Sequence, residues 1–158
     1  MLEYRATFRV ARTPAEVFDV IGTRCYENHP RWEPEVIEIR PLIPGPIGLG
    51  SRAVMVRREL GRRSEATYEV TVFEPGCRIA FRHLDGPMGF ELSFDLRPAG
   101  ASDTDLEVCV RMQPMGALRL LSPLLAFQLP GRSERITRRM IALVEAARVD
   151  APGTLLPA

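Results

Sequence analysis

The side chains best suited to acid–base chemistry or to orienting a ligand in this sequence are His83 and Tyr68. Each falls on the apolar side of an alternating segment, so each is expected to face the interior of a predicted sheet. A buried imidazole or phenol needs a hydrogen-bond partner, which a ligand carbonyl or hydroxyl could supply. His83 could also act as a general base, because an imidazole has an ordinary pKa of about 6.5.

Each of these residues also has a purely structural interpretation. His83 could instead lie at a strand end, solvated beside Asp85. Tyr68 could be a core phenol that bonds to a neighbouring backbone group. The second histidine, His29, is expected at the surface, and Trp32 either closes one mouth of a pocket or packs beneath a pair of short helices.

Several reaction classes are excluded by residue types that the chain lacks. All 21 basic residues are arginine, so Schiff-base, pyridoxal and phosphate-loop chemistry have no lysine to use. The cysteines, Cys25, Cys77 and Cys109, are too few and too far apart for a disulfide framework or a paired zinc site. No nucleophile has an evident base partner. We therefore expect no metal, no cofactor and no catalytic triad.

The length and charge of the chain limit its organisation and partners. At 158 residues and 46% hydrophobic, it has the size and composition of one domain, which we place at residues 1–149, followed by a flexible tail at 150–158. A net charge of +1 gives no global attraction to nucleic acid. Without a leader pattern or an apolar run of about 20 residues, the protein is expected to be cytoplasmic and not inserted in a membrane.

Alternation of polar and apolar residues predicts a mainly antiparallel sheet. Seven strands are expected, at residues 2–11, 36–42, 51–60, 64–74, 78–84, 90–97 and 106–112. The turns between neighbours are too short for parallel crossovers. After the first strand, Thr13-Pro14-Ala15-Glu16 is typical of a capped helix start, and the helix is expected to end near Gly22. One more turn over 24–29 should stop at Pro30.

The C-terminal part of the chain returns to a helical period. Apolar residues recur at i, i+4, i+7, i+8 and i+11 from Ile136 to Ala147, which predicts a long amphipathic helix. The leucine-rich stretch upstream of Pro130 is also helical in character. Because a proline inside a helix removes a hydrogen bond and costs about 3 kcal/mol, Pro130-Gly131 predicts a kink or a short break.

These elements indicate an α+β domain in which seven curved strands wrap around the long C-terminal helix, with two short helices after the first strand. A bent sheet need not close completely onto a helix, so a pocket is expected between them. Its lining is predicted from the inward sides of the strands and the leucine-rich stretch: Trp32, Met55, Tyr68, Phe81, His83, Phe90, Phe94, Met112, Leu120, Leu124 and Phe127. The alternative is that these apolar side chains simply pack against one another.

The order and spacing of several short motifs resemble the START-like, or birch-pollen-allergen-like, superfamily (SRPBCC), including its polyketide cyclase/dehydrase group. The motifs are VARTPAEVF at 10–18, PRW at 30–32, GLGS at 48–51 and YEVTVFEPGCRIAF at 68–81. The resemblance covers about residues 2–148 and implies a helix-grip fold. It is specific for the fold and not for a function, because one fold hosts many activities. The Pro130-Gly131 pair departs from the unbroken helix that the superfamily usually has.

Three functions are compatible with this sequence. The first is binding of a small hydrophobic or aromatic molecule in the internal cavity. The second is a polyketide cyclase/aromatase-like enzyme that uses the same cavity, with His83 or Tyr68 assisting enolisation or dehydration. The third is a protein-interaction module that uses the basic face of the last helix around Arg135 and Arg139. The chain could be a monomer or a homodimer.

Overall fold

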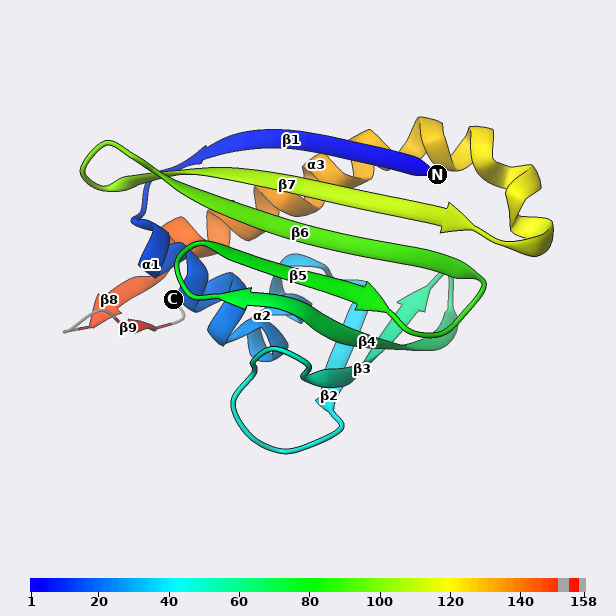
Figure 1. Cartoon of the computed structure of the whole chain (residues 1–158), viewed down its shortest axis with the longest axis horizontal. Helices are drawn as coiled ribbons and strands as arrows, with labels where there is room; N and C mark the ends of the chain where they lie inside the picture. The colour runs from blue at the N-terminus through cyan, green and yellow to red at the C-terminus, as the bar shows by residue number, and fades with distance from the viewer. Residues whose placement is uncertain (151–153, 157–158) are drawn as a thin grey trace.

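Seven antiparallel strands form one sheet in the spatial order β1-β7-β6-β5-β4-β3-β2, and helix α3 crosses one side of it (Figure 1). The computed structural model describes residues 1–150 and 154–156. In chain order the elements are β1 (Leu2–Val10), α1 (Pro14–Phe18), the π-helix η1 (Asp19–Thr23), α2 (Cys25–Trp32), β2 (Val36–Pro41), β3 (Arg52–Glu59), β4 (Arg62–Glu74), β5 (Arg78–His83), β6 (Met88–Ala99), β7 (Asp103–Pro114), the 3-10 helix η2 (Gly116–Leu121), α3 (Ser122–Ala146), β8 (Arg148–Asp150) and β9 (Thr154–Leu156).

The predicted architecture is confirmed: seven antiparallel strands, a long C-terminal helix and short helices after β1. Burial alternates along β1, as its period-two sequence requires when one face is covered. The first and last strands of the sheet in chain order are neighbours, because β1 pairs with β7 along its whole length, from Leu2 opposite Met112 to Val10 opposite Thr104. This pairing places β1 at one edge of the sheet.

The start of α1 forms the predicted capping box. The amide of Thr13 donates to Glu16 Oε2 at 2.8 Å, and the amide of Glu16 donates to the Thr13 hydroxyl oxygen at 3.4 Å. The helical segment ends at Thr23, close to the expected Gly22, and its last turn, η1, is π-helical. A Cβ atom at Gly22 would lie 2.8 Å from the ring of Phe18, so glycine permits this close turn.

The expectation that Pro30 ends the second helix is wrong. Helix α2 continues to Trp32, and the amide of Glu33 donates to the His29 carbonyl at 3.0 Å beyond the proline. Burial of both His29 and Trp32 stabilises this last turn. The continued turn places Glu33 directly above His29 at the i, i+4 spacing.

Of the two outcomes expected at Pro130, a kink or a short break, the break is not found, because α3 runs without interruption from Ser122 to Ala146. The missing amide of Pro130 leaves the Ala126 carbonyl without its helical donor. Both residues are exposed, so water can hydrogen-bond that carbonyl. The helix therefore tolerates the proline on its solvent side.

The last residues form a small feature that the sequence did not predict. Strands β8 and β9 pair antiparallel with each other, with Val149 opposite Leu155. The rest of the expected flexible tail, residues 151–153 and 157–158, lies outside the described residues. Within the part of the chain that is described, no helix is both long and apolar enough to cross a membrane.

Replacing Pro130 by alanine should stabilise the protein. The substitution restores the amide that pairs with the Ala126 carbonyl, which outweighs the greater freedom that alanine gives the unfolded chain. We expect the free energy of unfolding, measured by urea denaturation, to rise by about 1 to 2 kcal/mol.

Pro123 provides the matched control, because it stands at the start of α3, where a backbone amide has no helical partner. Pro123→Ala should leave stability nearly unchanged. A Pro130→Ala variant that is less stable than the wild type would contradict a continuous helix.

Candidate functional site

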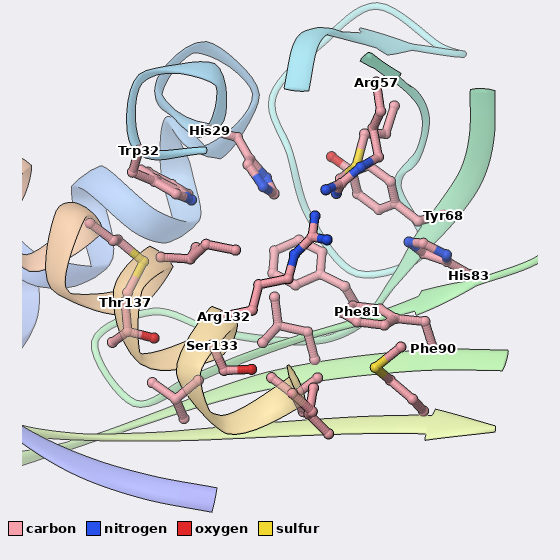
Figure 2. A pocket seen from close by; sticks show the side chains of 18 of the residues that line it. His29, Trp32, Arg57, Tyr68, Phe81, His83, Phe90, Arg132, Ser133 and Thr137 are labelled. Atoms are coloured by element: carbon pink, nitrogen blue, oxygen red, sulfur yellow. The ribbon is translucent and has the colours of Figure 1, made fainter. Parts of the chain in front are cut away.

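A pocket of about 370 Å³ lies between the sheet and α3, with α2 at one end (Figure 2). Strands β3 to β7 supply one wall and α3 the opposite wall. This volume is in the range of sites for small organic molecules. Most side chains around it are aliphatic or aromatic, with a few polar groups among them.

The sheet wall follows from the register of neighbouring strands. Residues that pair directly across two strands project from the same face, and the pocket is lined by both members of several such pairs. The pairs are Tyr68 with His83, Phe90 with Met112, Leu92 with Val110, and Phe94 with Val108. Met55 and Phe81 complete the aromatic and apolar surface from β3 and β5.

Eight of the predicted lining residues are placed around the pocket. They are Trp32, Met55, Tyr68, Phe81, His83, Phe90, Phe94 and Met112. Trp32 is buried in the core and also borders the pocket. The same side chain therefore packs in the core and lines the pocket.

The placement of Leu120, Leu124 and Phe127 in the pocket is wrong, because all three are exposed on the outside. Since α3 is continuous through Pro130, the buried stripe extends upstream from Ile136 in steps of three or four residues. The helix residues that line the pocket are therefore Leu125, Gln128, Leu129, Arg132, Ser133, Ile136, Thr137 and Met140.

Tyr68 carries an unsatisfied polar group at the pocket wall. Its side chain is 2% exposed, and its hydroxyl has no hydrogen-bond partner among the described residues. The structural interpretation of a phenol bonded to nearby backbone is thus wrong. Burial raises the pKa of the phenol, so Tyr68 remains protonated and can donate a hydrogen bond.

His83 stands beside Tyr68 at the end of β5. Its ring lies 4.8 Å from the ring of Phe90, and the residue is half-buried at the pocket wall. Burial and then the positive charge of Arg57 lower the pKa of His83, although the nearby Asp85 carboxylate opposes this. The imidazole is therefore neutral near pH 7 and can accept or donate one hydrogen bond.

The polar end of the pocket contains a cluster of charged side chains that the sequence did not predict. We call His29, Glu33, Arg57, Glu59 and Arg132 the charged cluster. His29 Nε2 lies 2.8 Å from Glu33 Oε2, and Arg57 Nη2 donates to Glu33 Oε1 at 2.6 Å. Arg132 pairs with Glu59, so α2, β3 and α3 meet through these contacts.

The burial of His29 corrects the expectation of a surface position. The residue is 8% exposed, and its ring stacks on Trp32 with centroids 5.1 Å apart. Arg57 turns inward with Met55 because both lie on the same face of β3, and its charge is offset by Glu33 and Glu59. The sequence signal for this arrangement is the i, i+4 spacing of His29 and Glu33.

Glu33 is the most strongly perturbed acid of the charged cluster. Burial opposes its ionisation, but the hydrogen bond from His29 and the charge of Arg57 outweigh that effect and lower its pKa from 4.5 to about 2. Burial alone raises the pKa of Cys25 at the pocket wall to about 12, so that thiol stays protonated. The described residues contain no group of three or more His, Cys, Asp or Glu side chains placed to hold a metal ion.

Substituting Glu33 by glutamine should destabilise the protein and change its response to acid. Loss of the carboxylate leaves Arg57 without a buried partner, so we expect a cost of about 3 kcal/mol at pH 7. Because the pKa of Glu33 is lower in the folded state, its contribution is complete above pH 4.5 and disappears as the pH falls toward about 2. The difference between the variant and the wild type in urea denaturation should shrink over that interval.

Glu27→Gln is the control for this measurement, because Glu27 lies on the same helix and is exposed. It should change stability by no more than about 0.5 kcal/mol. A constant difference between Glu33→Gln and the wild type from pH 7 to about pH 3 would argue against an ionised, buried Glu33.

Comparison with solved structures shows the same fold in distant proteins. A START superfamily protein from Mycobacterium smegmatis has a TM-score of 0.74 at 17% identity, covering 90% of this chain and 97% of that one. The protein TTHA0849 from Thermus thermophilus has a TM-score of 0.73 at 18% identity, with 91% and 97% covered. Truncated norcoclaurine synthase from Thalictrum flavum has a TM-score of 0.70 at 12% identity, with 92% and 94% covered.

Sequence comparison identifies the family. No curated protein sequence matches this chain significantly. The family described as polyketide cyclase / dehydrase and lipid transport matches residues 1–145, which is nearly the whole domain. The fold is the one that the resemblance to the START-like superfamily implies, and the family match shows that the chain belongs to the polyketide cyclase / dehydrase and lipid transport family.

Proposed function

We propose that this protein binds a small hydrophobic or aromatic molecule that carries one neutral hydrogen-bonding group, in the pocket between the sheet and α3. The observation that carries the proposal is the unpaired hydroxyl of Tyr68 in an otherwise largely apolar wall. A buried polar group without a partner is costly, so a ligand that accepts a hydrogen bond from it gains affinity.

The charges around the pocket favour a neutral ligand. Two arginines of the charged cluster, Arg57 and Arg132, are offset by Glu33 and Glu59. The pKa of His83 is lowered, so that ring adds no charge near pH 7. A charged ligand would lose its hydration without finding an unpaired countercharge.

The size of the pocket is compatible with measurable affinity. Burying roughly 300 Å² of apolar ligand surface at about 25 cal/mol per Å² supplies about 7 kcal/mol before the cost of association is subtracted. One additional hydrogen bond contributes about 1 kcal/mol. Since association costs at least about 4 kcal/mol, about 4 kcal/mol remains, which corresponds to a Kd of roughly 1 mM for a ligand of two or three fused rings. A cytoplasmic location remains part of the proposal, supported by free Cys25, Cys77 and Cys109.

Tyr68→Phe separates the role of the hydroxyl from that of the pocket. With 2-naphthol as probe, the variant should bind about five- to tenfold more weakly, because one hydrogen bond is lost. With 2-methylnaphthalene, which has no such group, affinity should not change. Both are measured by isothermal titration calorimetry.

Two further variants complete this test. Tyr26→Phe removes a hydroxyl that lies outside the pocket lining and should leave 2-naphthol affinity unchanged. Ser133→Phe fills the pocket from α3 and should abolish binding of both probes, with circular dichroism confirming that the variant is folded. If neither probe binds the wild type, or if Ser133→Phe binds both normally, the proposed site is wrong.

A second candidate function is acid–base catalysis in the same pocket, and the contact between His29 and Glu33 favours it. Ionised Glu33 can only accept a hydrogen bond, so the Nε2 atom of His29 carries the proton between them. When the imidazole ring is neutral, its lone pair is then on Nδ1. His29 projects from α2 into the pocket (Figure 2). Nδ1 could remove a proton from a carbon next to a carbonyl, while the C–H electron pair moves into the enolate and Nδ1–H later returns the proton.

The probe for this second function is 5-nitrobenzisoxazole, whose ring opens to a coloured phenolate when a base removes its carbon-bound proton. His29→Gln should lower the rate about 100-fold, the lower end of what a positioned base contributes. His83→Gln makes the same chemical change at another pocket residue and should retain most of the rate. Equal rates for the wild type and His29→Gln would exclude His29 as the base.

A further inference from the structure

The beginning of α3 and the preceding η2 expose an unusual amount of apolar surface. We call Met115, Leu120, Leu121, Leu124 and Phe127 the apolar tip. Leu120 is 84% exposed and Phe127 is 86% exposed, and the other three are also exposed. Figure 1 shows this stretch, in yellow, at one end of the molecule beyond the end of β7. Clustered exposed apolar side chains of this kind mark interaction surfaces.

The apolar tip is separate from the pocket lining, although both use the same helix. Leu125 and Leu129 face the pocket, whereas Leu124 and Phe127 point to the opposite side. Two helical turns take about seven residues, so residues seven apart lie on the same side of α3. The outer stripe that contains Leu124 and Phe127 therefore continues to Gly131, Arg135 and Arg138, which are all exposed. The outer stripe of α3 is therefore apolar near its beginning and mostly basic further along, where exposed Glu134 pairs with Arg138.

The charged residues near the apolar tip are mostly arginine. Between Val108 and Ser133 the sequence contains no aspartate or glutamate and three arginines. Exposed Arg119 lies within the tip, and Arg135 and Arg139 follow on the outside of α3. In the part of the chain that the structure describes, these three make no ion pair. The whole chain has a net charge of only +1, so this excess is local.

We propose that the apolar tip docks on the surface of an anionic lipid bilayer, with Arg119, Arg135 and Arg139 contacting lipid headgroups. Exposed leucine and phenylalanine side chains enter the boundary between headgroups and acyl chains, and arginines add attraction to anionic lipid. The contact is interfacial and needs no spanning helix. Docking brings the α3 wall of the pocket to the bilayer surface, because Leu125 and Leu129 lie on the inner side of the same turns.

A second copy of the chain fits this surface less well. In a symmetric dimer the same patch faces itself, so the unpaired arginines of both copies would be brought together. Like charges repel, the apolar tip itself has no acidic residue, and Glu134 further along α3 is already paired with Arg138. An anionic bilayer offers the complementary charge that a second copy lacks.

Vesicle co-sedimentation tests this proposal without any pocket ligand, so its outcome is independent of the proposed function. The wild type should bind vesicles of equal parts phosphatidylglycerol and phosphatidylcholine at least tenfold more strongly than vesicles of phosphatidylcholine alone. Binding should weaken in about 1 M salt, where the Debye length is about 3 Å. Leu120→Ser with Phe127→Ser should reduce binding at least tenfold, and Arg119→Gln with Arg135→Gln should remove the preference for anionic vesicles.

Ile43→Ser with Leu49→Ser is the matched control, because these loop residues are 82% and 73% exposed and lie outside the apolar tip. This control should bind vesicles like the wild type. Thermal unfolding checks that each variant is folded. Docking is refuted if the wild type does not sediment with anionic vesicles, or if the control loses binding as strongly as the tip variant. A dimer in analytical ultracentrifugation that is lost in the tip variant would assign the surface to a second copy instead.

Discussion

The arrangement of the pocket depends on one buried carboxylate, that of Glu33. One of its oxygens bonds to His29 on α2 and the other to Arg57 on β3, and Arg132 of α3 lies 3.6 Å away. A carboxylate that is only 9% exposed is stable as an anion only while those partners stay in place. The two elements that hold it, and the helix that closes over it, therefore cannot shift independently. The ionised state of Glu33 and the position of α3 over the sheet are two consequences of the same contacts.

Because these charges satisfy one another, the polar groups of the pocket fall into two kinds. Glu33, Arg57, Glu59 and Arg132 are paired and contribute to the shape of the wall. The Tyr68 hydroxyl is left without a partner within the described structure. A paired group does not readily exchange its partner for a ligand, because breaking a buried ion pair costs several kcal/mol. An unpaired donor gains a hydrogen bond from a ligand that brings an acceptor. Under the proposed function, Tyr68 is therefore the polar side chain that selects a ligand, and the paired groups hold the site that surrounds it.

The strands and their inward faces were predictable from the sequence, and the phases of the helices were not. Side chains alternate strictly along a strand, so Tyr68, Phe81 and Phe90 could be assigned to the inner face once the turns were placed. In a helix each residue advances by about 100° around the axis. A wrongly placed break therefore changes which residues are assigned to the inner side on the far side of that break. Treating Pro130 as a break detached the leucine-rich stretch from the stripe at Ile136. His29 was missed because the helix was expected to stop at Pro30, and because its partner Glu33 is paired with Arg57, which comes from a strand far along the chain.

The continuity of α3 also explains why one helix can have two different apolar surfaces. A helix that packs on one side needs a single apolar stripe, which Leu125, Leu129, Ile136 and Met140 provide. Leu124 and Phe127 add a second, exposed surface outside the core cluster of the described chain, and this surface ends where the outer stripe reaches Arg135. Pro130 lies between Phe127 and Arg135 on the solvent side of α3, where water can hydrogen-bond the Ala126 carbonyl that lacks a helical donor. The inner stripe is thus required by the fold of the pocket, whereas the outer apolar surface has no role in that fold and is available for contact with something outside the molecule.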